Sequence, residues 1–158
     1  MQPFEIKEYP DKILRKRCQP LGKVTESEVK IFERMTSTMK NFHGVGLAAP
    51  QIGICYKLIV ADIGEGVVKL ANPQVVKRKG KDKMVEGCLS LPETAVEVKR
   101  DYEIVVIGFN EKGKHIELKT KGLLARVLQH EIDHLKGRLI IDYMPFWDRI
   151  KFKVKKGR

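Results

Sequence analysis

The segment GLLARVLQHEIDHL constrains the fold of this chain more than any other, because it places charged side chains on an apolar face. Its periodicity predicts an amphipathic helix over 123–136 that ends at Gly137. At about 100° per residue, Glu131 falls near the centre of the leucine-rich stripe and His134 falls within it. A buried carboxylate without a partner costs several kcal/mol or takes up a proton. The helix therefore needs a compensating cation on its buried face.

The opposite side of this helix is expected to face solvent. Arg126, Gln129 and Asp133 fall there, so we expect Arg126 at the rim of a pocket or in solvent. Asp133 and Arg100, the latter on a predicted long strand, form a possible ion pair that would hold the helix against the sheet. A second interpretation, in which both side chains are solvated, stays equally open.

The two histidines of the same segment could bind one metal ion. His130 and His134 are four residues apart, so both imidazoles can reach the same ion. Glu131 falls beside them on the inner side, where a base that takes a proton from an activated water would lie. An HExxH pattern also arises by chance, with a glutamate that only forms a salt bridge. The apolar surroundings predicted for Glu131 disfavour that alternative, because a surface salt bridge does not need the buried face.

A catalytic metal site also needs a third protein ligand and an open position. The segment EGCLSLP, residues 86–92, offers Cys88, with Gly87 beside it to allow a tight backbone turn. A free cysteine is more often a small buried hydrophobic residue, and the residues alone leave that alternative open for Cys88. Cys18 and Cys55 have no neighbouring glycine and are assigned that structural role. Three cysteines are too few for a disulfide framework, and their odd number would leave one unpaired.

A run of small residues marks a third segment of interest. In HGVGLAAPQIG, residues 43–53, two glycines and two alanines indicate a backbone that another group approaches closely. Gln51 near the end of this segment supplies an amide donor. The alternative is an ordinary loop between a helix and a strand. His43 follows the end of a helix, where a histidine is favourable in any case, and we place it outside the site together with His115.

The remaining pattern predicts an α+β fold in one domain, residues 1–158. A helix is expected over 25–42, with Thr25 and Glu28 forming a capping box. Its apolar positions share one face and should pack in the core: Val29, Phe32, Met35, Met39 and Phe42. Strands are expected at 56–63, 67–73, 95–109 and 114–120, the last two joined by a turn at 110–113. This order favours antiparallel or mixed β-sheets packed around a central metal-binding HExxH helix, with an N-terminal helix and a short C-terminal helix.

Charge and composition bear on partners and location. The formal net charge of +11 favours an anionic partner, although a lysine-rich solvated surface has the same composition. The basic tail at about 146–158 stands out, since the last ten residues hold six basic groups and no acid. No apolar run reaches the length of a membrane span, and the N-terminus is unlike a signal or transit peptide. We expect a cytoplasmic protein, or an organellar one after removal of a transit peptide, with no membrane or DNA partner.

Three segments taken together resemble a known family. GVGLAAPQ, EGCLS and QHEIDH, in this order and at this spacing, resemble the signature motifs of peptide deformylases. The N-terminal YPDKILRKRCQPL is similar to the opening of that family, and the likeness runs from about residue 6 to residue 143. The resemblance implies a hydrolase that removes the formyl group from the initiator formyl-methionine of nascent polypeptides and releases formate. It also implies one divalent ion held by Cys88, His130 and His134, natively Fe(II), with zinc, nickel or cobalt able to replace it.

The resemblance further implies the roles of individual residues. Glu131 would move protons from the activated water to the departing amine. The side chain of Gln51 and the backbone N–H of Leu89 would stabilise the oxyanion. Six residues would bind the N-formylmethionyl substrate, by pairing with its backbone or by lining an apolar slot for methionine: Val45, Gly46, Glu86, Gly87, Leu123 and Val127.

Two other functions compete with this one. A catalytically silent relative that binds the ribosome or RNA should lack at least one motif residue, yet Gln51, Cys88, Glu131 and both histidines are present. A general metalloprotease would share only the HExxH pattern and would not need EGCLS or Gln51. The basic tail could dock an active deformylase on ribosomal RNA, or it could simply be solvated.

Overall fold

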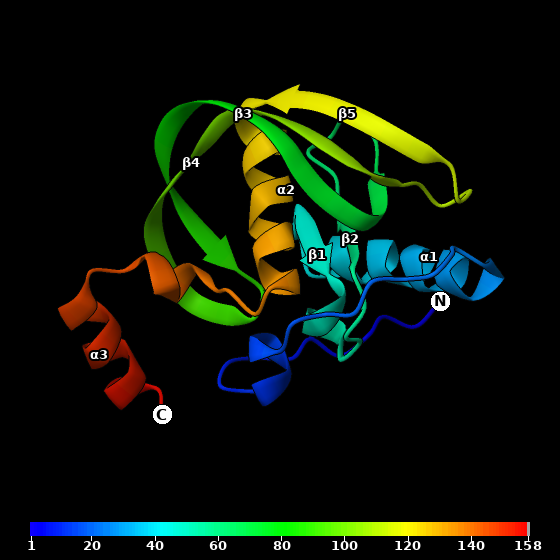
Figure 1. Cartoon of the computed structure of the whole chain (residues 1–158). Helices are drawn as coiled ribbons and strands as arrows, with labels where there is room; N and C mark the ends of the chain where they lie inside the picture. The colour runs from blue at the N-terminus through cyan, green and yellow to red at the C-terminus, as the bar shows by residue number, and fades with distance from the viewer. Residues whose placement is uncertain (158) are drawn as a thin grey trace.

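The structure, a computed structural model, describes residues 1–157 and has the predicted α+β fold (Figure 1). Three α-helices occur in this part of the chain: α1 (Glu26–Asn41), α2 (Gly122–Leu135) and α3 (Phe146–Lys155). One sheet holds five strands in the order β1 (Gly46–Ala48), β2 (Leu58–Ala61), β3 (Val68–Cys88), β4 (Leu91–Phe109) and β5 (His115–Lys121). Its neighbouring strands are all antiparallel within residues 1–157, so the predicted antiparallel sheet is confirmed. Short 3-10 helices lie at Lys12–Arg15, Ala49–Ile52 and Ile140–Tyr143.

The strands predicted from apolar patterns are present, with shifted ends. The segments expected at 56–63 and 67–73 pair as β2 and the start of β3. The turn expected at 110–113 joins β4 to β5, and the N–H of Gly113 donates to the carbonyl of Asn110 at 2.9 Å. Strand β1 and the second half of β3 have no counterpart among the predicted strands, because neither segment alternates apolar and polar residues.

Strands β3 and β4 form a long hairpin that arches over α2 (Figure 1). Register shifts near Ala71, Val75 and Glu86 interrupt the ladder, and such irregularities bend and twist a hairpin. The bend carries the tip of the hairpin, where Cys88 pairs with Leu91, back toward the helix. The hairpin therefore forms one wall of the space above α2.

Helix α1 begins at the predicted capping box. The carboxylate of Glu28 accepts the backbone N–H of Thr25 at 2.8 Å, and the Thr25 side chain caps the first turn in return. Three of the predicted core side chains are fully buried: Phe32, Met35 and Met39. Phe42, also expected in the core, is 43% exposed, because the helix ends at Asn41 and the chain turns away.

Strand β2 is buried on both faces and separates two parts of the core. Leu58 and Val60 pack with the apolar face of α1, whereas Ile59 and Ala61 pack with α2. A strand covered on both faces has a continuous apolar sequence and not an alternating one. Full burial of Leu58, Ile59 or Val60 contributes about 1.5–3 kcal/mol for each side chain. This packing fixes β1 and β2 against the helix that carries the histidines.

Helix α2 is covered on both sides, which the helical periodicity did not predict. Arg126 and Gln129 are only 4% and 7% exposed. The Gln129 amide accepts the N–H of Asp101 at 3.1 Å and donates to the carbonyl of Asp101 at 2.8 Å. Of the two positions expected for Arg126, at a pocket rim or in solvent, the solvent position is wrong, because the β3–β4 hairpin covers that side of the helix.

The C-terminal tail contains the predicted short helix, α3. Phe152 contacts Tyr9, with ring centroids 5.6 Å apart, and so holds this helix to the N-terminal segment. Trp147 on the same helix is 71% exposed. Residue 158, the last of the predicted tail, lies outside the described residues. None of the helices formed by residues 1–157 is long and apolar enough to cross a membrane.

Candidate active site

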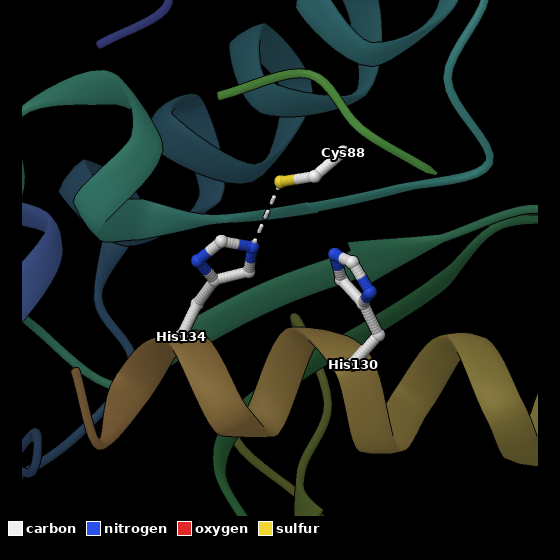
Figure 2. Close-up of side chains that lie close together, drawn as sticks. All are labelled: Cys88, His130 and His134. Atoms are coloured by element: carbon white, nitrogen blue, oxygen red, sulfur yellow. Dashed lines mark hydrogen bonds between the residues drawn. The ribbon is translucent and has the colours of Figure 1, made fainter. Parts of the chain in front are cut away.

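Two elements bring together the three predicted metal ligands. Cys88 is the last residue of β3, and His130 and His134 follow each other by one turn on α2 (Figure 2). One potential ligand atom from each residue lies within 4.8 Å of the others. The sulfur of Cys88 is 3.4 Å from His134 Nε2. A single ion can bridge atoms at this spacing.

The turn between β3 and β4 fixes the position of Cys88. Ser90 within this turn is fully buried, and its carbonyl accepts the N–H of Tyr9 at 2.9 Å. The N-terminal segment thus holds the turn against the rest of the molecule. The expected tight turn lies beside Cys88, at Leu89 and Ser90, and Gly87 lies at the register shift between Glu86 and Cys88 without a left-handed conformation.

Glu86 orients the imidazole of His130. Its Oε1 atom lies 2.9 Å from His130 Nδ1, which leaves Nε2 of the ring available to an ion. Burial favours a protonated Glu86, but hydrogen bonds from Arg100 and His130 outweigh it and lower the pKa of Glu86 to about 2. Glu86 therefore stays charged and can keep hold of the Nδ1 proton.

Arg100 connects this carboxylate to the outer side of α2. Its guanidinium donates to Glu86 at 2.6 and 2.8 Å and to Asp133 at 2.8 Å. The predicted ion pair between Asp133 and Arg100 is thus confirmed. The hydroxyl of Tyr143 also donates to Asp133, at 2.6 Å. These bonds hold the histidine-bearing helix against the hairpin.

His134 and Glu131 are buried on the inner side of α2. Burial lowers the pKa of His134 well below 6.5, which favours the neutral imidazole that metals bind. For Glu131, burial disfavours the charged carboxylate and raises its pKa to about 7. This value suits an acid–base group that works at neutral pH. Among residues 1–157, neither His134 Nδ1 nor Glu131 Oε2 has a hydrogen-bond partner.

Gly46 allows strand β1 to approach Glu131 closely. A Cβ at this position would collide with the Glu131 carboxylate and with the side chain of Val127. The close approach expected from the glycines of residues 43–53 is therefore found at Gly46. It places a strand edge directly beside the buried carboxylate.

Gln51 is held with its amide nitrogen toward the same space. Its Oε1 accepts the N–H of Ala48 at 2.9 Å, which fixes the orientation of the amide. Its Nε2 lies 3.1 Å from Ser90 Oγ and 3.6 Å from the sulfur of Cys88. Gln51 is only 1% exposed, so the donor is fixed before any ligand arrives.

These residues surround a cavity of about 390 Å³. All six predicted substrate-binding residues line it, together with Gln51, Cys88, Leu89, His130 and Glu131. Arg126, expected at a pocket rim or in solvent, also lines it, and sequence reasoning missed four further lining residues: His43, Gly44, Met84 and Val85. His43 was expected outside the site, and it reaches the cavity because the chain turns there with φ +56°. Met84 and Val85 directly precede the EGC motif in the sequence. This proximity was the one sequence feature that could have placed them at the cavity.

The donor set suits a divalent transition-metal ion. A thiolate and two imidazoles are ligands for iron(II), zinc, nickel or cobalt, and not for magnesium or calcium. The unpartnered carboxylate oxygen of Glu131 lies buried beside them. An ion at Cys88, His130 and His134 would supply the cation that this buried carboxylate needs.

Comparisons with known proteins point to one family. Residues 3–149 match the sequence model of the family described as polypeptide deformylase. The peptide deformylase of Carboxydothermus hydrogenoformans is 42% identical over 158 residues, which is the whole of both chains. The crystal structure of the Thermotoga maritima peptide deformylase superimposes with a TM-score of 0.88 at 43% identity, over 90% of this chain and 97% of that one. The Ehrlichia chaffeensis peptide deformylase in complex with actinonin gives a TM-score of 0.94 at 34% identity, over 100% and 99%.

Proposed function

Because this chain belongs to the polypeptide deformylase family, we propose that the cavity above α2 is its active site, with Cys88, His130 and His134 as the metal ligands. Enzymes of this family are metal-dependent hydrolases that remove the N-formyl group from nascent chains. The observation that carries the proposal is the meeting of three ligand atoms within 4.8 Å beside the buried Glu131, whose Oε2 has no hydrogen-bond partner among residues 1–157.

The proposed resident ion is Fe(II), with zinc, nickel or cobalt able to take its place. The mixed thiolate and imidazole ligands do not discriminate strongly among these ions. When bound, such an ion would act as a Lewis acid toward water and toward the formyl carbonyl. Glu86 and Arg100 would keep the ring of His130 in the orientation that presents Nε2.

The protein groups around the ion would then move the proton and stabilise charge. Glu131 would accept a proton from the attacking water and pass it to the amine nitrogen as the formyl C–N bond breaks. The Nε2 of Gln51 and the N–H of Leu89 would donate to the developing oxyanion. Removal of one such donor typically costs about 3 kcal/mol of transition-state stabilisation.

The proposed substrate is a formylmethionyl peptide that pairs with β1. This strand is an edge of the sheet, so one of its sides is open to an added strand, with Val45 and Gly46 nearest the cavity. Gly87 would add a carbonyl from the opposite wall. The methionine side chain would occupy an apolar slot between Val45, Leu123 and Val127, with Glu86 closing its wall. Exclusion of acetyl groups requires a tight formyl end, because one methyl group is worth only about 1–3 kcal/mol in an open pocket.

The test of this proposal is formate release from formyl-Met-Ala by protein purified anaerobically, with metal analysis of the same sample. We expect one formate for each Met-Ala produced and no reaction with acetyl-Met-Ala. A silent RNA-binding relative would release no formate at any metal content. A general metalloprotease would cut internal bonds of longer, unformylated peptides, and either result would contradict the proposed activity.

We further propose that the basic tail docks the enzyme on the ribosome, where nascent chains emerge. Four basic side chains of α3 support this, and the last three of them are exposed: Arg149, Lys151, Lys153 and Lys155. The relatives compared are bacterial proteins, which favours the bacterial cytoplasm over an organelle as the place of action.

Replacement of the exposed lysines of α3 by glutamine is expected to weaken ribosome binding several-fold and to flatten its salt dependence. The physical reason is that each phosphate contact releases bound counterions. Co-sedimentation with ribosomes at two salt concentrations measures this, with Lys112, Lys114 and Lys119 on the far hairpin replaced as a matched control. Ribosome binding that is independent of salt, or equal in the two triple variants, would contradict the docking proposal.

A further inference from the structure

Arg126 is a buried charge that the mechanism above does not use. It lies on α2, one turn before His130, and only 4% of it is exposed. Each of its Nη atoms makes two hydrogen bonds, whereas its Nε has no partner among residues 1–157. Burial of a guanidinium is costly unless its partners are fixed with good geometry. The identity of these partners indicates what Arg126 does.

The first group of contacts leads to the metal ligand His130. Nη1 of Arg126 donates to Glu86 Oε2 at 2.6 Å, and the other oxygen of the same carboxylate faces His130 Nδ1 at 2.9 Å. Arg100, on β4, donates to both oxygens of this carboxylate. Two arginines thus hold Glu86 from two elements: Arg100 binds both carboxylate oxygens, and Arg126 adds a second bond to Oε2. The orientation of His130 depends on that carboxylate.

The second group of contacts leads to the wall of the cavity. Nη1 of Arg126 donates to the carbonyl of Val98 at 2.8 Å, and Nη2 donates to the carboxylate and carbonyl of Asp82 at 2.7 and 3.0 Å. Both partners belong to the β3–β4 hairpin. Val98 pairs with Met84, and Met84 and Val85 line the cavity. Arg126 therefore sets the distance between the hairpin wall and α2.

We propose that Arg126 is a positioning residue with two roles, resting on the function proposed above: it fixes the carboxylate that orients His130, and it holds the hairpin wall of the substrate cavity. Its Nη atoms are occupied by Glu86, Asp82 and Val98, so it does not offer a free charge to the substrate. Its influence on the reaction passes through His130 and through the wall.

The two roles can be separated with Arg126→Met, Arg126→Lys and Asp82→Ala. We expect Arg126→Met to lower the affinity for Co²⁺ several-fold, up to about 10-fold, which is the low end of the effect of losing a direct partner of a ligand, because Arg126 acts through Glu86. It should also shift the visible absorption of the bound cobalt and raise KM for formyl-Met-Ala. Arg126→Lys keeps one donor for Glu86 and should recover part of the cobalt affinity. Asp82→Ala should raise KM while leaving cobalt affinity and spectrum unchanged.

Arg78→Met is the matched control, because Arg78 pairs with Asp101 on the same hairpin at 3.0 Å without touching Glu86. It should leave cobalt affinity, spectrum and KM as in wild type. A folded Arg126→Met protein with wild-type cobalt affinity and spectrum would overturn the proposal. If circular dichroism shows that this variant does not fold, Arg126→Lys with wild-type values would overturn it equally. Wild-type protein without a thiolate-to-cobalt absorption band would instead contradict the ligand set itself.

Discussion

Replacement of Glu131 by glutamine should lower kcat/KM for formyl-Met-Ala by about 10²- to 10⁴-fold, the range that general acid–base groups contribute. The amide has nearly the size of the carboxylate but cannot accept the proton of the attacking water. The loss corresponds to about 3–5 kcal/mol of transition-state stabilisation. Formate release should be measured at matched metal content, since Glu131 is not among the proposed ligands and the ion should stay bound.

The matched control is Glu33→Gln on the exposed side of α1, which should leave formate release unchanged. An activity of Glu131→Gln within tenfold of wild type, at full metal content, would remove Glu131 from the role of proton carrier. A loss of metal together with activity would instead assign Glu131 to the ligand set. The two outcomes separate proton transfer from metal binding.

Cys88→Ala should lose both the metal and nearly all activity. Zinc sites built from several cysteines and histidines bind the ion with about 10–16 kcal/mol. In this protein three ligands would divide the binding free energy among them. Loss of one of them should therefore cost several kcal/mol, or about 10²- to 10³-fold in affinity. The measurement is metal per chain after dialysis, followed by formate release from the same sample.

Cys55→Ala is the appropriate control, since Cys55 is also partly exposed but lies 3.7 Å from Cys18 and not among the three potential metal ligands. It should keep one ion per chain and wild-type activity. Retention of one tightly bound ion and full activity by Cys88→Ala would show that the third ligand is another residue.

Much of the fold could be predicted from apolar patterns, but the second half of β3 could not. The helix with the Thr25 and Glu28 capping box, strand β2 and the turn at 110–113 carry local patterns of their own. The basic stretch KRKGKDK has no apolar alternation and is a strand because β4 pairs with it. The apolar periodicity of a single segment does not reveal a strand that forms only because a distant segment pairs with it.

In the site, too, residues with a local sequence pattern could be predicted, and residues whose partners lie far along the chain could not. His130 and Glu131 could be selected from spacing and from charge placed on an apolar face, whereas Cys88 became a predicted ligand only through the family resemblance. Arg126 could not, because a helical wheel assigns a face by polarity and places arginine in solvent. Its partners Glu86 and Asp82 lie 40 and more residues earlier and meet it only when the hairpin folds over α2.

X-ray absorption at the zinc K edge of zinc-loaded protein tests the ligand set most directly. Coordination by Cys88, His130 and His134 predicts one zinc per chain, with one sulfur at about 2.3 Å and nitrogen at about 2.0–2.1 Å in the first shell. The sulfur should disappear from the spectrum of any zinc that Cys88→Ala retains. A wild-type shell without sulfur, or sulfur that persists in Cys88→Ala, would contradict the account.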